Sequence, residues 1–305
     1  MTALRALLAG IVDYAGLFPP AALDMPTAVR NYASYCAEDA AWMLGRFVVP
    51  IARLDEFAAA REKIGDDQPE WRLTGIAGAD VAADLVRVRE FNRAHGGQSS
   101  IDSIEAKLGT VDAIRAAAAE SAADACSLFA EIPLEPDPAP LVQAIKAVGI
   151  SAKLRTGGVT PEAIPSPAFV GRALRRCVDA GVRFKATAGL HHPLRAEHPL
   201  TYDTGAPVGV MYGYLNVFLS AAFMHEGMSD SDAERLLDER SVAAIQVSDS
   251  GIAWERFRLS TDQVRHIRSE LAVSFGSCSF REPVDELRDL ALLDRDEITE
   301  RESEN

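Results

Sequence analysis

The sequence predicts an α/β protein, a (β/α)8 barrel of the TIM-barrel type with an extra helix at the C-terminus. Short apolar runs alternate with helical patterns along most of the 305 residues, which is typical of a parallel sheet covered by helices. Eight such units suit a closed barrel better than an open sheet. An open doubly wound sheet would usually carry a GxGxxG turn after its first strand, and none follows Tyr14.

The strands are expected where the apolar runs are short. These runs cover residues 10–14, 42–49, 71–76, 100–108, 126–132, 150–154, 182–187 and 243–247. The helical patterns cover residues 26–35, 54–64, 80–95, 111–123, 140–148, 167–180, 208–224, 231–239 and 260–275. Pro26 suits a helix start, Gly96 a helix end, and Ser260 with Gln263 a capping box.

The barrel is expected to form one domain over residues 1–284. Residues 285–305 carry nine acids and three arginines, so we expect an acidic terminal helix or a frayed tail there.

Composition narrows the function classes. Hydrophobic residues make up 48% and charged residues 25% of the chain, as in soluble globular proteins. The net charge of −14 argues against a nucleic-acid or anionic-membrane partner, so we expect a small-molecule substrate. The uncharged stretch 208–224 is expected to be a buried helix rather than a membrane span. Homo-oligomerisation stays open.

The four cysteines are far apart and form no CxxC pattern. With no signal peptide apparent, this favours a reducing, cytoplasmic location. No cofactor is expected.

Polar residues gather at the carboxyl ends of the predicted strands, where barrel enzymes hold their catalytic groups. They are Asp13, Glu105, Lys107, Glu131, Lys153, Arg155, Lys185, Ser248 and Asp249. Lys153 and Arg155 lie two residues apart and therefore share one face of their strand. Because a charge in a strand is costly unless it is paired or functional, we expect this set to line the barrel mouth.

Two lysines near a carboxylate are typical of Schiff-base chemistry. A lysine attacks a carbonyl group only when it is unprotonated, and both desolvation and a neighbouring cation lower its pKa. Lys153 is the expected nucleophile, and Lys185 on the next strand is expected to lower its pKa. Glu131 is the expected proton shuttle, with His191 or His192 assisting.

The remaining polar groups are expected to bind substrate. Arg155 and the backbone amides of Gly157 and Gly158 can hold an anionic group. Glu105, Lys107, Asp13, Ser248 and Asp249 complete the expected binding set. The predicted function is a carbon–carbon lyase acting on a small anionic carbonyl compound.

Two segments resemble the deoxyribose-phosphate aldolases, which are class I (Schiff-base) enzymes. They are AKLRTGGVTPE at 152–162 and RFKATAGLH at 183–191. The resemblance implies that Lys153 on strand six forms the Schiff base and that Lys185 on strand seven tunes it. Arg155, Gly158 and Ala188 depart from the family pattern. No counterpart of the family's phosphate-binding serines is apparent at residues 248–254, after the expected eighth strand.

Two other functions stay open. His191, His192 and His198, with strand-end carboxylates, could serve a metal-dependent hydrolase or isomerase. Alternatively, the barrel only binds a ligand, which predicts that the lysines are ion-paired at the surface. Cys278 is expected to be structural and to lie at the face opposite the mouth, because it follows the helix predicted at 260–275.

Overall fold

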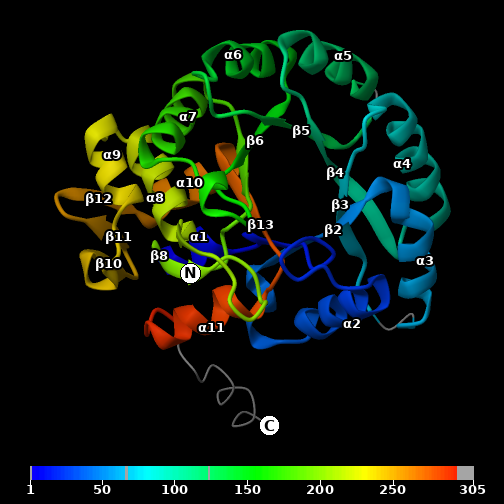
Figure 1. The fold of residues 1–305 in the computed structure, drawn as a ribbon, viewed down its shortest axis with the longest axis horizontal. Helices are drawn as coiled ribbons and strands as arrows, with labels where there is room; N and C mark the ends of the chain where they lie inside the picture. Colours follow the sequence, from blue (N-terminus) through cyan, green and yellow to red (C-terminus); the bar gives the residue numbers. More distant parts are fainter. Residues whose placement is uncertain (1, 66–67, 123, 294–305) are drawn as a thin grey trace.

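The computed structural model describes residues 2–65, 68–122 and 124–293. Eight parallel strands close into a barrel in the order β1-β13-β7-β6-β5-β4-β3-β2, with helices outside (Figure 1). The barrel strands are β1 (Val12–Tyr14), β2 (Leu44–Pro50), β3 (Trp71–Ile76), β4 (Ser99–Lys107), β5 (Ser127–Ile132), β6 (Ser151–Arg155), β7 (Phe184–Thr187) and β13 (Ala272–Ser277). The (β/α)8 prediction is therefore confirmed.

Helices follow most strands, as predicted. They are α1 (Ala3–Leu8), α2 (Met25–Cys36), α3 (Leu54–Glu62), α4 (Val81–His95), α5 (Val111–Ser121), α6 (Ala139–Val148), α7 (Pro167–Ala180), α8 (Tyr214–His225), α9 (Asp230–Leu237), α10 (Thr261–Glu270) and α11 (Arg281–Asp289). The capping box of Ser260 and Gln263 begins α10. Residue 123, at the end of the helix expected at 111–123, lies outside the described residues.

The assignment of residues 243–247 to the eighth barrel strand is wrong. This run forms β10 (Ile245–Ser248), which pairs antiparallel with β11 (Gly251–Trp254) and, through it, with β12 (Phe257–Ser260), outside the barrel. The barrel closes instead through β13, which pairs in parallel with β1 and β7. The helix predicted at 260–275 ends at 270, and its last residues begin this strand.

The stretch 208–224 is mostly a buried helix, as expected. Its first residues form β9 (Val208–Met211), which pairs with β8 (Ala196–Pro199) in a two-stranded hairpin inserted after β7. The helix α8 follows and is buried from Tyr214 to Met224. Phe218 packs against Phe184 of β7 and Phe275 of β13, so this helix seals the barrel wall.

The C-terminal helix begins earlier than expected. The expected boundary between residues 284 and 285 falls inside α11, whose buried Val284 and Leu287 belong to the main core. The predicted tail beyond residue 293 lies outside the described residues. Among the described residues, the helices are all too short or too polar to cross a membrane.

Candidate active site

A cavity of about 520 Å³ opens at the carboxyl ends of the barrel strands. Its charged wall carries Glu105, Lys107, Glu131, Lys153 and Arg155 from the adjacent strands β4, β5 and β6. The alternation of side chains along these strands therefore points these five residues into one space, whereas Asp13 and Lys185 of the expected set do not line the cavity.

Lys153 lies between two carboxylates. Its Nζ is 2.6 Å from Glu105 Oε2 and 2.9 Å from Glu131 Oε2. Lys153 is 6% exposed and lines the cavity, so it combines burial with access to a small ligand.

Lys185 lies next to Lys153 in register but deeper in the barrel. Its Nζ is 2.9 Å from Asp13 Oδ2 and 3.3 Å from Glu105 Oε1. The same ammonium donates to Thr74 Oγ1 at 3.1 Å and to Ser103 Oγ at 3.0 Å. Its hydrogen-bonding capacity is used inside the protein, so Lys185 is fixed in the barrel interior and does not line the cavity.

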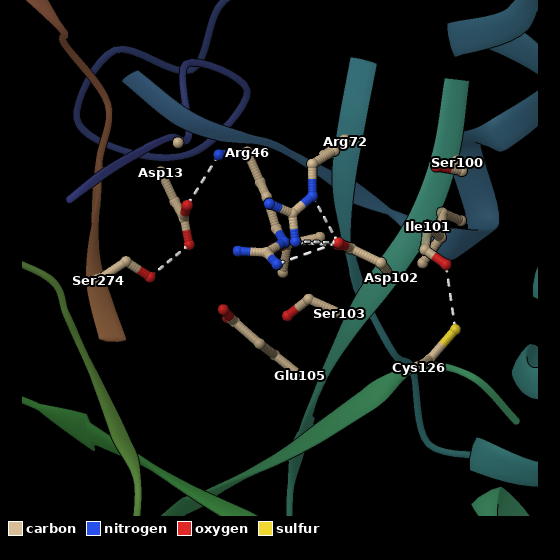
Figure 2. Close-up of polar contacts among 12 residues, drawn as sticks. Asp13, Arg46, Arg72, Ser100, Ile101, Asp102, Ser103, Glu105, Cys126 and Ser274 are labelled. Carbon is tan, nitrogen blue, oxygen red and sulfur yellow. Dashed lines mark hydrogen bonds and ion pairs between the residues drawn. The ribbon is translucent and has the colours of Figure 1, made fainter. Parts of the chain in front are cut away.

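Asp13 is held as firmly as the lysine that it binds. Its Oδ1 accepts from the backbone N–H of Arg46 at 2.8 Å, and its Oδ2 accepts from Ser274 Oγ at 2.8 Å (Figure 2). A Cβ atom at Gly45 would lie 2.4 Å from Asp13 Oδ1, so a glycine is needed there to leave room for the carboxylate.

A second polar cluster lies nearer the amino ends of β2, β3 and β4, where the Arg72 side chain is 62% exposed. Asp102 accepts from Arg46 Nε at 2.5 Å and from Arg72 Nε at 2.7 Å (Figure 2). The two arginines lower the pKa of Asp102 against the opposing effect of burial. The sequence reasoning missed this cluster because these residues stand in the strands rather than at their ends.

The charges determine the protonation of Lys153. Burial alone would lower its pKa, but Glu105 and Glu131 raise the pKa above its ordinary value. Burial raises the pKa of Glu105, but the two lysines outweigh this effect and lower it. The net pKa of Lys153 is therefore raised in this arrangement, because both carboxylates contact its ammonium, and Glu105 lies between it and Lys185.

Glu131 connects Lys153 to Arg155 at the rim of the cavity. Its Oε1 accepts from Arg155 Nε at 3.0 Å, while its Oε2 faces Lys153. Lys153 and Arg155 together lower the pKa of Glu131 against the effect of burial. The Lys107 side chain is exposed on the same wall and has no ion pair with any of the described residues.

Gly157 and Gly158 line the cavity and permit close packing between loops. A Cβ atom on Gly157 would lie 3.1 Å from Ala188 O, and one on Gly158 would lie 2.6 Å from Ala163 Cβ. Thr156 reinforces the first contact, because its hydroxyl donates to Ala188 O at 2.9 Å. These glycines therefore bring the ends of β6 and β7 together at the cavity edge.

Of the histidines, only His191 lines the cavity. Its Nδ1 is 3.0 Å from Ser277 Oγ, and burial, with a smaller effect of its histidine neighbours, lowers its pKa to about 4. His192 instead pairs with Glu286 at 2.6 Å and stacks on His198 at a centroid distance of 3.4 Å. Within the described residues, His, Cys, Asp and Glu side chains form no group of three or more that could hold a metal ion.

Ser248 and Asp249 are not part of this site. They lie at the end of β10, in a surface hollow that they share with Thr2 and Arg5. They were expected at the mouth because the sequence pattern assigns residues 243–247 to the eighth barrel strand. Since that assignment is wrong, the prediction that they line the site is wrong as well.

Cys278 is at the mouth, contrary to expectation. It follows β13 directly, and it lines the cavity with His191, whose Nδ1 lies 3.8 Å from the sulfur. Burial raises the pKa of this thiol. The short run of apolar residues at 271–275 is the signal that could have identified the strand.

Neither the known family models nor the curated proteins match this chain. The function must therefore be argued from the site itself. Lys153 is buried and lines the cavity, and Lys185 is buried deeper in the barrel, so neither lysine shows the surface pairing expected of a barrel that only binds a ligand.

Proposed function

We propose that this protein is a Schiff-base-forming carbon–carbon lyase that acts on a small anionic carbonyl compound. The observation that carries the proposal is Lys153, a buried amine that faces a cavity and lies within 2.9 Å of two carboxylates. An amine can form a covalent intermediate with a carbonyl group, and a carboxylate in contact with it can carry the protons. The short resemblance to class I aldolases around Lys153 and Lys185 supports the same chemistry.

The reaction begins with a proton transfer. The ammonium of Lys153 gives a proton to Glu131, and the neutral amine adds to the carbonyl carbon. The new C–N bond pushes the carbonyl π electrons onto oxygen, which takes the proton back to give a carbinolamine. Loss of water then leaves a protonated imine, in which the positively charged nitrogen attracts electrons from the neighbouring carbon.

The imine allows the carbon–carbon bond to break. The hydroxyl group of the departing carbon loses its proton to Glu131 and becomes a second carbonyl, while the bond's electron pair moves into an enamine. Glu131 returns this proton to the enamine carbon, and hydrolysis of the resulting protonated imine by water releases the product and restores the Lys153 ammonium. Each proton removed by the carboxylate is thus returned within the cycle.

The other residues position these groups. Lys185 and Glu105 hold the reactive lysine in place, and Asp13 anchors Lys185 from below. His191 is neutral near pH 7, because its pKa is lowered to about 4. It can therefore exchange hydrogen bonds with substrate without adding charge. His192 faces Glu286, so the assisting role falls to His191.

Borohydride trapping tests the proposal. The protein is incubated with pyruvate or acetaldehyde at pH 7 and pH 9, reduced, digested and mapped by mass spectrometry. We expect a reduced adduct on the Lys153 peptide, and none at that position in Lys153→Arg. Lys146→Arg, an exposed lysine on α6, is the matched control and should trap like the native protein. Adducts spread evenly over surface lysines, with none enriched at Lys153, would remove the mechanism.

A further inference from the structure

Two sides of the cavity mouth differ in chemistry, and between them Thr187, His191 and Cys278 line it at the ends of β7 and β13. The charged side comes from β4, β5 and β6 and carries the ion network. The opposite side comes from β1, β2 and β3 and the loops that follow them. Its lining side chains are all apolar, and they are Ala15, Phe18, Pro19, Pro20, Val48, Ile76 and Ala77.

The apolar side is also poor in backbone donors. Pro19 and Pro20 have no N–H group. The N–H groups of Ala15, Phe18 and Ala77 already donate to Ser277 O at 2.7 Å, Ala15 O at 2.9 Å and Glu105 O at 2.9 Å. A hydroxyl or phosphate group placed against this side would lose its water without gaining a partner, which is unfavourable.

The serines after β13 do not compensate for this. Ser277 Oγ pairs with His191 and accepts from the N–H of Ser279, and Ser279 Oγ accepts from the N–H of Glu282. These hydroxyls hold the loop between β13 and α11 together. Both oxygens accept hydrogen bonds within the protein, and neither serine lines the cavity.

The charged side has one more cationic side chain than it has carboxylates to compensate them. Lys153 and Lys185 share Asp13, Glu105 and Glu131, so these ammonium groups are compensated. Arg155 also contacts Glu131 but remains half exposed, and Lys107 has no ion pair among the described residues. An anion bound beside Arg155 and Lys107 would be compensated in turn.

We infer that the substrate is a hydroxy oxo acid with an apolar tail, the hydroxyl group being the one that the proposed cleavage requires. Its carboxylate binds beside Arg155 and Lys107, its carbonyl group faces Lys153, its hydroxyl group faces Glu131, and its hydrocarbon tail packs on the side formed by β1–β3. This inference rests on the proposed function for the role of Lys153, but the dependence of affinity on chain length can be measured whether or not an imine forms. A cavity of about 520 Å³ has room for such a chain.

Calorimetric titration tests the inference with pyruvate, 2-oxobutanoate, 2-oxopentanoate and 2-oxohexanoate. We expect affinity to rise about threefold to fourfold with each methylene group, the gain that corresponds to burying one CH2. 2-Hexanone, which lacks the carboxylate, should bind at least tenfold more weakly than 2-oxohexanoate. Deoxyribose 5-phosphate and glyceraldehyde 3-phosphate should also bind more weakly. Affinity that does not depend on chain length, or that is highest for a phosphorylated compound, would overturn the inference.

A matched pair of variants locates the effect. Val48→Thr keeps the shape of a 5% exposed residue but adds a hydroxyl to the apolar side, and should lower affinity for 2-oxohexanoate at least threefold relative to pyruvate. Val208→Thr makes the same change in the hairpin, at a residue that is 48% exposed and does not line the cavity. It should leave the affinity for 2-oxohexanoate relative to pyruvate unchanged. Equal effects of the two variants would contradict the placement of the chain.

The two proposals can fail separately. Chain-length dependence without a Lys153 adduct would leave the oxo-acid site standing and remove the lyase. A Lys153 adduct together with a preference for phosphorylated compounds would support the lyase and remove the oxo-acid site.

Discussion

Removal of the Glu105 charge should lower the pKa of Lys153 by about two to three units. Glu105 contacts Lys153 at 2.6 Å, and each of the two side chains is only 8% exposed, so solvent screens the pair weakly. Two unit charges about 4 Å apart interact by roughly 4 kcal/mol at an effective dielectric constant of about 20, which corresponds to about three pKa units. In Glu105→Gln, Glu131 still stabilises the ammonium, but Lys185 then repels it without an intervening anion.

Competitive labelling with acetic anhydride measures this pKa. The reagent is small enough for the cavity, it reacts only with the neutral amine, and the exposed Lys146 serves as an internal standard. Labelling of Lys153 in the native protein should rise with pH into the alkaline range. The midpoint in Glu105→Gln should lie about two to three units lower.

Glu162→Gln is the matched control. It removes the same charge at an exposed position near Arg155, where solvent screens the interaction, so the midpoint should move by less than about half a unit. Thermal unfolding verifies that each variant is folded. A midpoint that stays in place or rises in folded Glu105→Gln would refute the electrostatic account of the site.

Two further predictions concern stability. Gly45→Ala should destabilise the protein by about 1–3 kcal/mol in urea unfolding, because its methyl group would lie 2.4 Å from Asp13 Oδ1 and 3.0 Å from a backbone oxygen. Gly109→Ala, which meets open space, should change stability by less than about 0.5 kcal/mol, and equal effects would contradict the steric argument. The pKa of His191 is about 4 in the fold against 6.5 ordinarily, so the unfolded state binds the extra proton as pH falls below 6.5. Between pH 6.5 and pH 4, the free energy of unfolding of the native protein should therefore fall by up to about 3 kcal/mol more than that of His191→Asn. If the two proteins instead lose stability in parallel, this histidine is not buried in its neutral form.

Local patterns in the sequence were sufficient to predict much of the fold and most residues of the charged wall of the cavity. The first seven strands lie where apolar runs predicted them, because strand formation there follows a short-range pattern. Lys153 and Arg155 share a face because side chains alternate along any strand. The same reasoning, applied to neighbouring parallel strands, placed Glu105 and Glu131 at the cavity, and Lys185 lies against Glu105 deeper in the barrel.

Closure of the barrel depends on contacts that no local pattern contains. Residues 243–247 and 272–277 are both short apolar runs, but only the second pairs with β1, whose residues lie some 260 positions earlier. That pairing moves Cys278 to the mouth and leaves Ser248 and Asp249 outside it.

The charge state of Lys153 likewise depends on neighbours from separate strands. The sequence places two lysines at adjacent strand ends, and like charges alone would lower the pKa of each. Only the closed barrel brings Glu105 between them, because side chains from β4, β6 and β7 converge in its interior. Covalent order along the chain decides which groups each strand presents, and the closed three-dimensional packing decides which of those groups meet.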